Sequence, residues 1–349
     1  MDRPTIKGRG AADNPQGRFE KLIRSRHEGD EVQSRPETVI TLQQARSIIA
    51  RNDSPDLPFS QSINPYQGCE HGCIYCYARP SHAYLGLSPG LDFETRLFAK
   101  ENAAELLRKE LSHPNYRCEL ISLGANTDPY QPIERERRIT RDILEVLWEF
   151  RHPVGIVTKG SLIERDLEVL AAMAQEDLVH VFVSIGTLDG EIARTLEPRA
   201  AAPYRRVETI RRLSARGVPC GTLVAPIVPF LNDKDMETVL EAVSEAGARM
   251  AGYTLLRLPW EVRDLFKDWL VRHYPLKAEH IMARIRDMRG GRDNDPEFGS
   301  RMKGEGKYAE LIRSRFTIAC TRLGLNTGER NRLDTTKFRR PGPRQSSLF

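Results

Sequence analysis

The chain has 349 residues, 40% of them hydrophobic and 29% charged, which is long enough to bury a substantial core. Its mean hydropathy is −0.49 and no apolar run is long enough to cross a bilayer, which excludes a membrane-spanning protein. The net charge of +5 permits an anionic partner such as nucleic acid, but this excess is small beside 53 basic residues.

The N-terminal segment, residues 1–58, is rich in Gly, Pro, Arg and Asp, and we expect it to form a partly ordered extension. Within it, Thr38-Val39-Ile40-Thr41 has the pattern of a strand, and residues 43–50 predict a short helix. No apolar stretch follows Met1, so we expect no secretory signal and a cytoplasmic location.

Three cysteines follow the first predicted strand of the main domain, residues 62–67. Cys69, Cys73 and Cys76 form a C-x3-C-x2-C triplet, and Gly68 and Gly72 give this loop the backbone freedom to wrap a ligand. Soft thiolates favour an iron–sulfur cluster or zinc. An Fe4S4 cube has one iron more than the triplet has thiolates, so one iron would stay free to bind something other than protein.

A zinc site is the alternative, because His71 would complete a closed set of three cysteines and one histidine. Structural zinc usually shows two separated ligand pairs, and this chain has no second pair. The remaining cysteines each stand alone in apolar surroundings and are expected to be reduced core residues: Cys118, Cys220 and Cys320.

From residue 62 onward, short apolar strands alternate with helices. Five further strands are predicted at residues 119–123, 154–158, 179–185, 218–225 and 252–258. The helical patterns between them cover residues 140–150, 163–174, 204–216 and 235–246. Six such units imply an α/β fold with a parallel sheet, either an open, partial (β/α)6 TIM-like barrel or a doubly wound sheet.

The C-terminal part changes character after the sixth strand. Residues 260–273, 278–288 and 307–323 predict helices that cover the open barrel edge. The loop Gly299-Ser300-Arg301-Met302-Lys303-Gly304-Glu305-Gly306 is either a phosphate cradle or a plain connection. We therefore divide the chain into an N-terminal extension, a core domain, a helical cap and a disordered basic tail, at residues 1–58, 59–300, 301–330 and 331–349.

The last five residues, Gln345-Ser346-Ser347-Leu348-Phe349, resemble the short peptide by which many bacterial replication and repair proteins attach to the DNA sliding clamp. Ser346 stands where that motif prefers an aliphatic residue. Two large apolar residues at the end of a tether are suited to a hydrophobic groove. The resemblance implies the bacterial DNA sliding clamp as a partner.

The cysteine triplet, with an aromatic residue before its third cysteine, resembles that of the radical S-adenosylmethionine (SAM) enzymes. The resemblance implies a partial TIM-like barrel of the radical SAM type, a [4Fe-4S] cluster and SAM as cofactors, and an electron donor such as flavodoxin or ferredoxin. It further implies that SAM chelates the open iron and is cleaved to methionine and a 5′-deoxyadenosyl radical, which abstracts hydrogen from a substrate. The aromatic residue, Tyr75, would lie against the adenine.

Within this family, residues 62–232 are most similar to the spore photoproduct lyase branch. The similarity rests on Cys-Ile-Tyr-Cys-Tyr-Ala at 73–78, Thr127-Asp128-Pro129, Lys159, Ser184, Leu196-Glu197-Pro198-Arg199, Arg206, Glu208 and Ala225-Pro226-Ile227. It implies that four residues bind SAM, through hydroxyls to the ribose and cations to the carboxylate: Thr127, Lys159, Ser184 and Arg199.

The turn after the second strand, Gly124-Ala125-Asn126-Thr127-Asp128, departs from the family pattern. Many members carry Gly-Gly-Glu there for the amino group of SAM, so in this chain Asn126, Thr127 or Asp128 must make that contact. The lyases also keep a cysteine beside this turn to return hydrogen to the substrate radical, whereas Cys118 lies at the opposite end of the strand. A tyrosine is the alternative donor: Tyr66, Tyr77, Tyr84 or Tyr130.

These observations predict a radical SAM enzyme, lyase-like or a transferase, that acts on nucleic acid and repairs damaged DNA. A second enzyme hypothesis is modification of a small molecule or a protein side chain. The hypothesis without catalysis is a zinc-bound module that binds nucleic acid. The sequence does not identify the catalytic residue.

Overall fold

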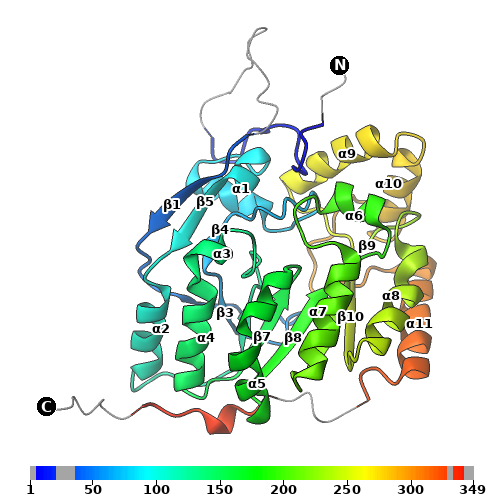
Figure 1. Ribbon diagram of the computed structural model, residues 1–349. Helices are drawn as coiled ribbons and strands as arrows, with labels where there is room; N and C mark the ends of the chain where they lie inside the picture. Colours follow the sequence, from blue (N-terminus) through cyan, green and yellow to red (C-terminus); the bar gives the residue numbers. More distant parts are fainter. Residues whose placement is uncertain (1–4, 21–35, 328–332, 342–349) are drawn as a thin grey trace, which may run out of the picture.

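The main element of the fold is a seven-stranded sheet (Figure 1), and the computed structural model describes residues 5–20, 36–327 and 333–341. Its strand order is β10-β9-β8-β7-β6-β3-β2. Six strands run parallel, β3 (Gln61–Ile63), β6 (Ile121–Leu123), β7 (Val154–Thr158), β8 (Val179–Ser184), β9 (Cys220–Ile227) and β10 (Met250–Leu255). The edge strand β2 (Ile49–Arg51) is antiparallel to β3.

The parallel strands follow one another in chain order, with no reversal in the part of the chain that the structure describes. A doubly wound sheet requires a reversal of strand order, so that alternative is wrong. The expected partial (β/α)6 barrel is confirmed, with β10 and β2 as its two edges. In such folds the side chains at the carboxyl ends of the strands form the site.

Helices cover the outer face of this sheet (Figure 1). The predicted ones are α4 (Ile139–Glu149), α5 (Leu167–Gln175), α7 (Pro203–Ala215) and α8 (Met236–Glu245), and a further helix, α2 (Ala103–Ser112), was not predicted. Their apolar faces pack on strand residues such as Ile156 and Val181, which are fully buried. Leu144 and Leu170 meet them from the helices.

Three more helices follow β10 as predicted, α9 (Glu261–His273), α10 (Ala278–Asp287) and α11 (Gly306–Leu323). Helix α11 lies beside α8 (Figure 1), where the Arg315 guanidinium donates to Glu237 over 2.6 Å. None of the helices in the described ranges is long and apolar enough to cross a membrane.

A second, three-stranded sheet has the order β1-β5-β4, with β1 (Val39–Gln43), β5 (Arg96–Lys100) and β4 (Tyr66–Gln67). The strand predicted at residues 62–67 is therefore divided between two sheets. The break falls at Asn64-Pro65, where proline has no N–H to continue a ladder. As a result the cysteine loop begins directly after β4, between the two sheets.

The helix predicted at residues 43–50 is wrong. Gln43 ends β1, and Ile49 begins β2. The intervening backbone donors bind distant side chains, because Ala45 N–H donates to Asn102 Oδ1 over 2.9 Å and Ile48 N–H to Glu110 Oε1 over 2.7 Å. These tertiary contacts replace the bonds that a helix would make.

The described residues near both termini pack on the core. Ile6, Ala11 and Ala12 are buried in the N-terminal segment. In the C-terminal tail, Phe338 lies against Phe150, with ring centroids 6.3 Å apart. The clamp-like segment at residues 345–349 lies outside the described residues.

Candidate active site

The cysteine triplet occupies one pinned loop. Cys69 N–H donates to Phe93 O over 2.9 Å, and Ile74 N–H donates to Leu196 O over 3.1 Å. Cys69 and Cys73 are 7% exposed and belong to two different hydrophobic clusters of the core. Cys76 is half-buried and packs against both clusters. The three thiols therefore lie in an apolar setting, and Cys76 is the most exposed of them.

Two glycines are needed for this loop, as the sequence predicted. Gly68 and Gly72 have φ of 78° and 66°, a region that residues with a side chain rarely adopt. A Cβ at Gly68 would lie 2.7 Å from Leu97 Cδ2, and one at Gly72 would lie 2.8 Å from Glu94 Oε2. The Glu94 carboxylate therefore packs directly against the cysteine loop at Gly72.

A buried ion pair braces the cysteine loop. Arg79 and Glu94 are both fully buried, and Arg79 Nη2 lies 2.5 Å from Glu94 Oε1. Arg79 also donates to Cys73 O over 2.9 Å and to Gly72 O over 3.1 Å. Glu94 accepts the N–H groups of Gly10 and Ala11. The pair thus ties the N-terminal segment to the loop, a role that the sequence analysis missed because the partners are far apart in the chain.

The electrostatic setting of the thiols fits a ligand that supplies positive charge. Burial raises the pKa of Cys73 to about 12, although Lys159 and Arg206 act to lower it. Burial also raises the pKa of Cys69, and Asp128 adds to the effect. Thiolates in this pocket therefore require a cationic partner, which the irons of a cluster would provide.

A single metal ion fits less well. In the described ranges, no three His, Cys, Asp or Glu side chains converge closely enough to hold one ion. His71, the fourth ligand of the zinc alternative, turns Nδ1 toward Asp128 Oδ2 at 3.3 Å. A cube spreads its ligands over three irons, so it does not require the thiols to meet at one point.

Tyr75 is fixed by a second buried pair. Its hydroxyl donates to Glu197, and Arg206 donates to the other oxygen of the same carboxylate. Burial alone would raise the pKa of Glu197, but Arg206 and Lys159 hold it below its usual value. Arg206 also donates to Ser184 O over 2.8 Å. The ring of Tyr75 is thereby held in one orientation beside the cysteine loop.

Lys159 lies where a cation would be needed. It follows β7, and its Nζ is 5.9 Å from the centre of the Tyr75 ring. Burial would lower its pKa, but Cys73 and Glu197 raise it above the usual value, so it stays charged. Of the cations predicted from the resemblance, Lys159 is the one that the structure brings next to a cysteine.

The turn after β6 is built around Asp128. Its carboxylate accepts Tyr130 N–H, Thr158 Oγ1 and Lys159 N–H at 2.9, 2.7 and 2.6 Å. Burial would raise the pKa of Asp128, but His71 and these hydrogen bonds lower it to about 2. Both oxygens are therefore engaged within the protein, and Asp128 is a positioning residue in this structure.

The neighbouring residues of the turn differ in whether their side chains are already hydrogen-bonded within the protein. Thr127 is buried and donates its hydroxyl to Tyr66 O over 2.7 Å. The N–H groups of Asn126 and Thr127 both point to Asn64 Oδ1. The Asn126 side chain has no hydrogen-bond partner among the described residues, so of the three candidates it is the one available to an amino group.

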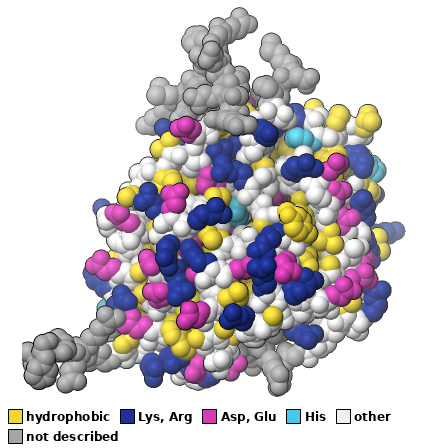
Figure 2. Space-filling model, viewed as in Figure 1, with side chains coloured by type: hydrophobic (Ala, Val, Ile, Leu, Met, Phe, Trp, Pro, Cys, Tyr) yellow, Lys and Arg dark blue, Asp and Glu magenta, His cyan; other side chains and the backbone are white. Residues whose placement is uncertain are grey.

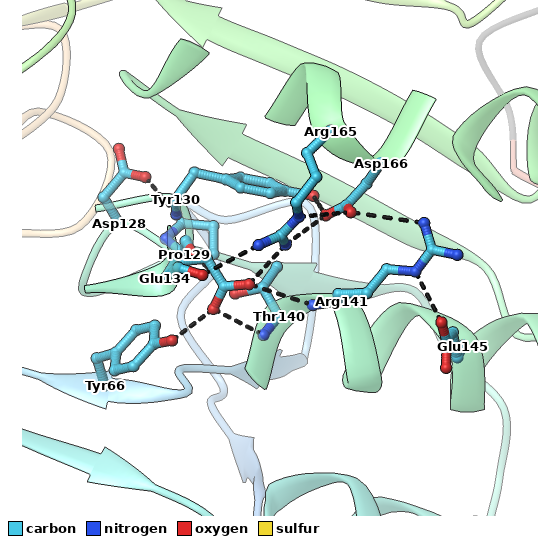
Figure 3. A network of polar contacts seen from close by, with 10 residues as sticks. All are labelled: Tyr66, Asp128, Pro129, Tyr130, Glu134, Thr140, Arg141, Glu145, Arg165 and Asp166. Atoms are coloured by element: carbon cyan, nitrogen blue, oxygen red, sulfur yellow. Dashed lines mark hydrogen bonds and ion pairs between the residues drawn. The ribbon is translucent and has the colours of Figure 1, made fainter. Parts of the chain in front are cut away.

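Figure 3 shows how this turn is supported from behind. Glu134 accepts hydrogen bonds from Tyr66 Oη, Thr140 N–H and Arg165. Tyr130 donates to Asp166 over 3.0 Å. The network joins β4 to the start of α4 and fixes the turn rigidly against the barrel.

The last two predicted SAM ligands have different surroundings. Ser184, at the end of β8, is buried and donates to Ala225 O over 3.4 Å. Arg199 instead pairs with Glu70 over 3.0 Å and lines a pocket of about 710 Å³. Neither Lys159 nor any of the three cysteines lines that pocket, although Glu70 and His71 of the cysteine loop do.

Comparison with known proteins places these features in a family. The sequence profile of the radical SAM superfamily matches residues 63–243. An uncharacterized protein of Mycobacterium bovis is 37% identical over 254 residues, which cover 71% of this chain and 74% of that protein. An uncharacterized protein of Methanocaldococcus jannaschii is 26% identical over 63% of this chain and 78% of its own length.

Among solved structures, spore photoproduct lyase complexed with dinucleoside spore photoproduct superposes with a TM-score of 0.58. The match is 15% identical and covers 82% of this chain and 80% of the lyase, which establishes a shared fold. The profile match carries the family assignment, and the cysteine triplet lies inside it. The chain is an enzyme that belongs to the radical SAM superfamily.

Proposed function

We propose that Cys69, Cys73 and Cys76 hold a [4Fe-4S] cluster and that SAM binds between this loop and Lys159. When bound, the cluster supplies the electron that cleaves SAM to methionine and a 5′-deoxyadenosyl radical. A donor such as flavodoxin or ferredoxin would deliver that electron. The observation that carries the proposal is the gathering of three thiols, two of them buried, beside one charged lysine.

The residues of this chain have separable roles in that proposal. Lys159 neutralises the SAM carboxylate next to an anionic cluster. The side-chain oxygen of Asn126 accepts a hydrogen bond from the amino group of SAM. Tyr75, held by Glu197, offers its ring to the adenine. The apolar side chains that pack around Cys73, among them Ile74 and Val228, keep water from a reactive radical.

The proposed SAM contacts predict different effects for the two cations. Lys159→Met is expected to weaken SAM binding by about 10- to 100-fold, the worth of one charge-assisted bond. Arg199→Met should weaken it less, because Arg199 already pairs with Glu70. Isothermal titration with SAM on cluster-loaded protein measures both. Unaltered affinity in both variants would remove these residues from the SAM site.

We further propose that the substrate is nucleic acid and that the reaction repairs damaged DNA. The support is the fold shared with a lyase that was solved with dinucleoside spore photoproduct. The overall charge of +5 is a weaker support. On the face seen in Figure 2, Lys and Arg side chains are interspersed with Asp and Glu, so charge alone does not mark a binding face.

The residue that would return hydrogen differs from the cysteine expected of the lyase branch. Cys118 precedes β6, at the end of the strand opposite to the cysteine loop. Of the four tyrosines considered, Tyr66 and Tyr130 are buried against carboxylates, and Tyr84 packs at a tilt against Phe19 at the surface. Tyr77 is the one beside the cluster loop, which makes it the candidate donor.

The substrate class is tested with ultraviolet-irradiated oligonucleotides. The reduced protein with SAM is expected to form 5′-deoxyadenosine faster when irradiated DNA is present than with the same DNA before irradiation. Mass spectrometry of the DNA should show loss of a photoproduct. If neither DNA alters the rate or is altered, the small-molecule or protein side-chain hypothesis takes its place.

A further inference from the structure

Arg257 has a guanidinium group that forms no ion pair within the described part of the chain. Arg257 follows β10, the strand at the open edge of the barrel. Its Nε is buried without a hydrogen-bond partner, and its Nη1 faces only Met302 Sδ at 3.6 Å. No carboxylate of the described residues forms an ion pair with it.

The two neighbouring arginines are satisfied by the protein. Arg301 donates to Asp56 and, over 2.6 Å, to Ser54 Oγ. Arg289 donates to the carbonyls of Leu256 and Arg301 over 2.9 and 2.8 Å. The phosphate cradle considered for the loop at residues 299–306 is thus not available through Arg301, whose charge Asp56 already neutralises.

Arg257 lies at the same edge of the sheet as the turn after β6. Arg257 follows β10 and the turn follows β6, and the carboxyl ends of these parallel strands share one edge. The Tyr77 side chain, next to Cys76, is 51% exposed, and its hydroxyl donates to Ala125 O in that turn. Arg257 also acts electrostatically on Tyr77.

An unpaired guanidinium in a partly buried position is costly to the protein. Burial lowers the pKa of Arg257 and Arg301 adds to this effect, while the carboxylates of Asp56 and Asp295 offset it only in part. An anionic oxygen group from a ligand would relieve both the missing hydrogen bonds and the unbalanced charge. The planar guanidinium is suited to grip such a group with two parallel bonds.

We propose that Arg257 binds an anionic oxygen group of the substrate and so anchors it at the barrel mouth, beside Tyr77. For the nucleic acid substrate proposed above, on which this assignment of the group rests, it is a backbone phosphate. Lys159 would then bind the carboxylate of the cofactor, and Arg257 the phosphate of the substrate.

Fluorescence anisotropy with a labelled, ultraviolet-irradiated oligonucleotide tests this on cluster-loaded protein. Arg257→Met is expected to weaken binding by about 10- to 100-fold and to reduce the slope of log affinity against log salt by about one. Arg257→Lys should retain part of the affinity. The matched control is Arg263→Met, because exposed Arg263 pairs with its neighbour Asp264 on the outside of α9 and should bind like the parent.

The other outcomes separate this inference from the proposed function. If the parent binds DNA and Arg257→Met binds equally well, the assignment of Arg257 is overturned while the nucleic acid substrate stands. If the parent does not bind DNA, calorimetry with inorganic phosphate decides. If the parent binds phosphate and Arg257→Met does not, the anion site at Arg257 stands. If the parent does not bind phosphate, the anion site is overturned. A loss of SAM affinity in Arg257→Met equal to the loss for DNA would assign Arg257 to the cofactor instead.

Discussion

Cys73→Ala is expected to abolish the formation of 5′-deoxyadenosine from SAM. A cube held by two cysteines loses the geometry that leaves one iron open, and Cys73 is the cysteine that Lys159 and Arg206 favour as a thiolate. The broad visible absorbance of the cluster near ~400 nm should fall with it. The measurement is chromatography of the reaction mixture after reduction, beside the absorbance spectrum.

The matched control for this prediction is Cys118→Ala, the same chemical change at a half-buried cysteine that precedes β6. It should keep both the spectrum and the activity. The assignment of the cluster would be wrong if the variant that lacks Cys69, Cys73 and Cys76 still formed 5′-deoxyadenosine.

Glu94→Gln should lower the free energy of unfolding by about 3–5 kcal/mol, which is typical of removing one partner from a buried ion pair. Arg79 would keep its charge in a fully buried position with no other carboxylate in ion-pair distance among the described residues. Urea unfolding followed by circular dichroism measures the change. The cluster should also be lost more readily, because Arg79 holds the carbonyls of Gly72 and Cys73.

An exposed ion pair provides the control. Glu241 pairs with Arg322 between α8 and α11, and the side chains are 44% and 58% exposed. Glu241→Gln should change the free energy of unfolding by less than about 1 kcal/mol. Equal losses in the two variants would show that the buried pair has no special part in holding the cysteine loop.

The order of strands and helices could be predicted from the sequence because the barrel units have strong local patterns. Residues 154–158 were predicted and found as β7. The pattern failed where distant side chains decide the backbone, as at Ala45 and Ile48, whose N–H groups bind Asn102 and Glu110. Local sequence holds no information about partners more than fifty positions away.

The candidate site, too, could be predicted only where its residues are close together in the sequence. The three cysteines lie within eight consecutive residues, and Gly68 and Gly72 indicate the turns that their loop requires. The supporting pairs are assembled by the fold, since Glu197 reaches Tyr75 across 122 positions. The lack of an ion pair at Arg257 is a property of its surroundings in the fold, so only its place near the end of a strand could be predicted from the sequence.

The central claim is that three cysteines leave one iron open for SAM, and electron paramagnetic resonance of the reduced protein tests it most directly. Our account predicts a cluster signal that changes when SAM is added, because SAM would bind the iron itself. A signal that SAM leaves unaltered, or protein that carries zinc and no iron, would contradict it.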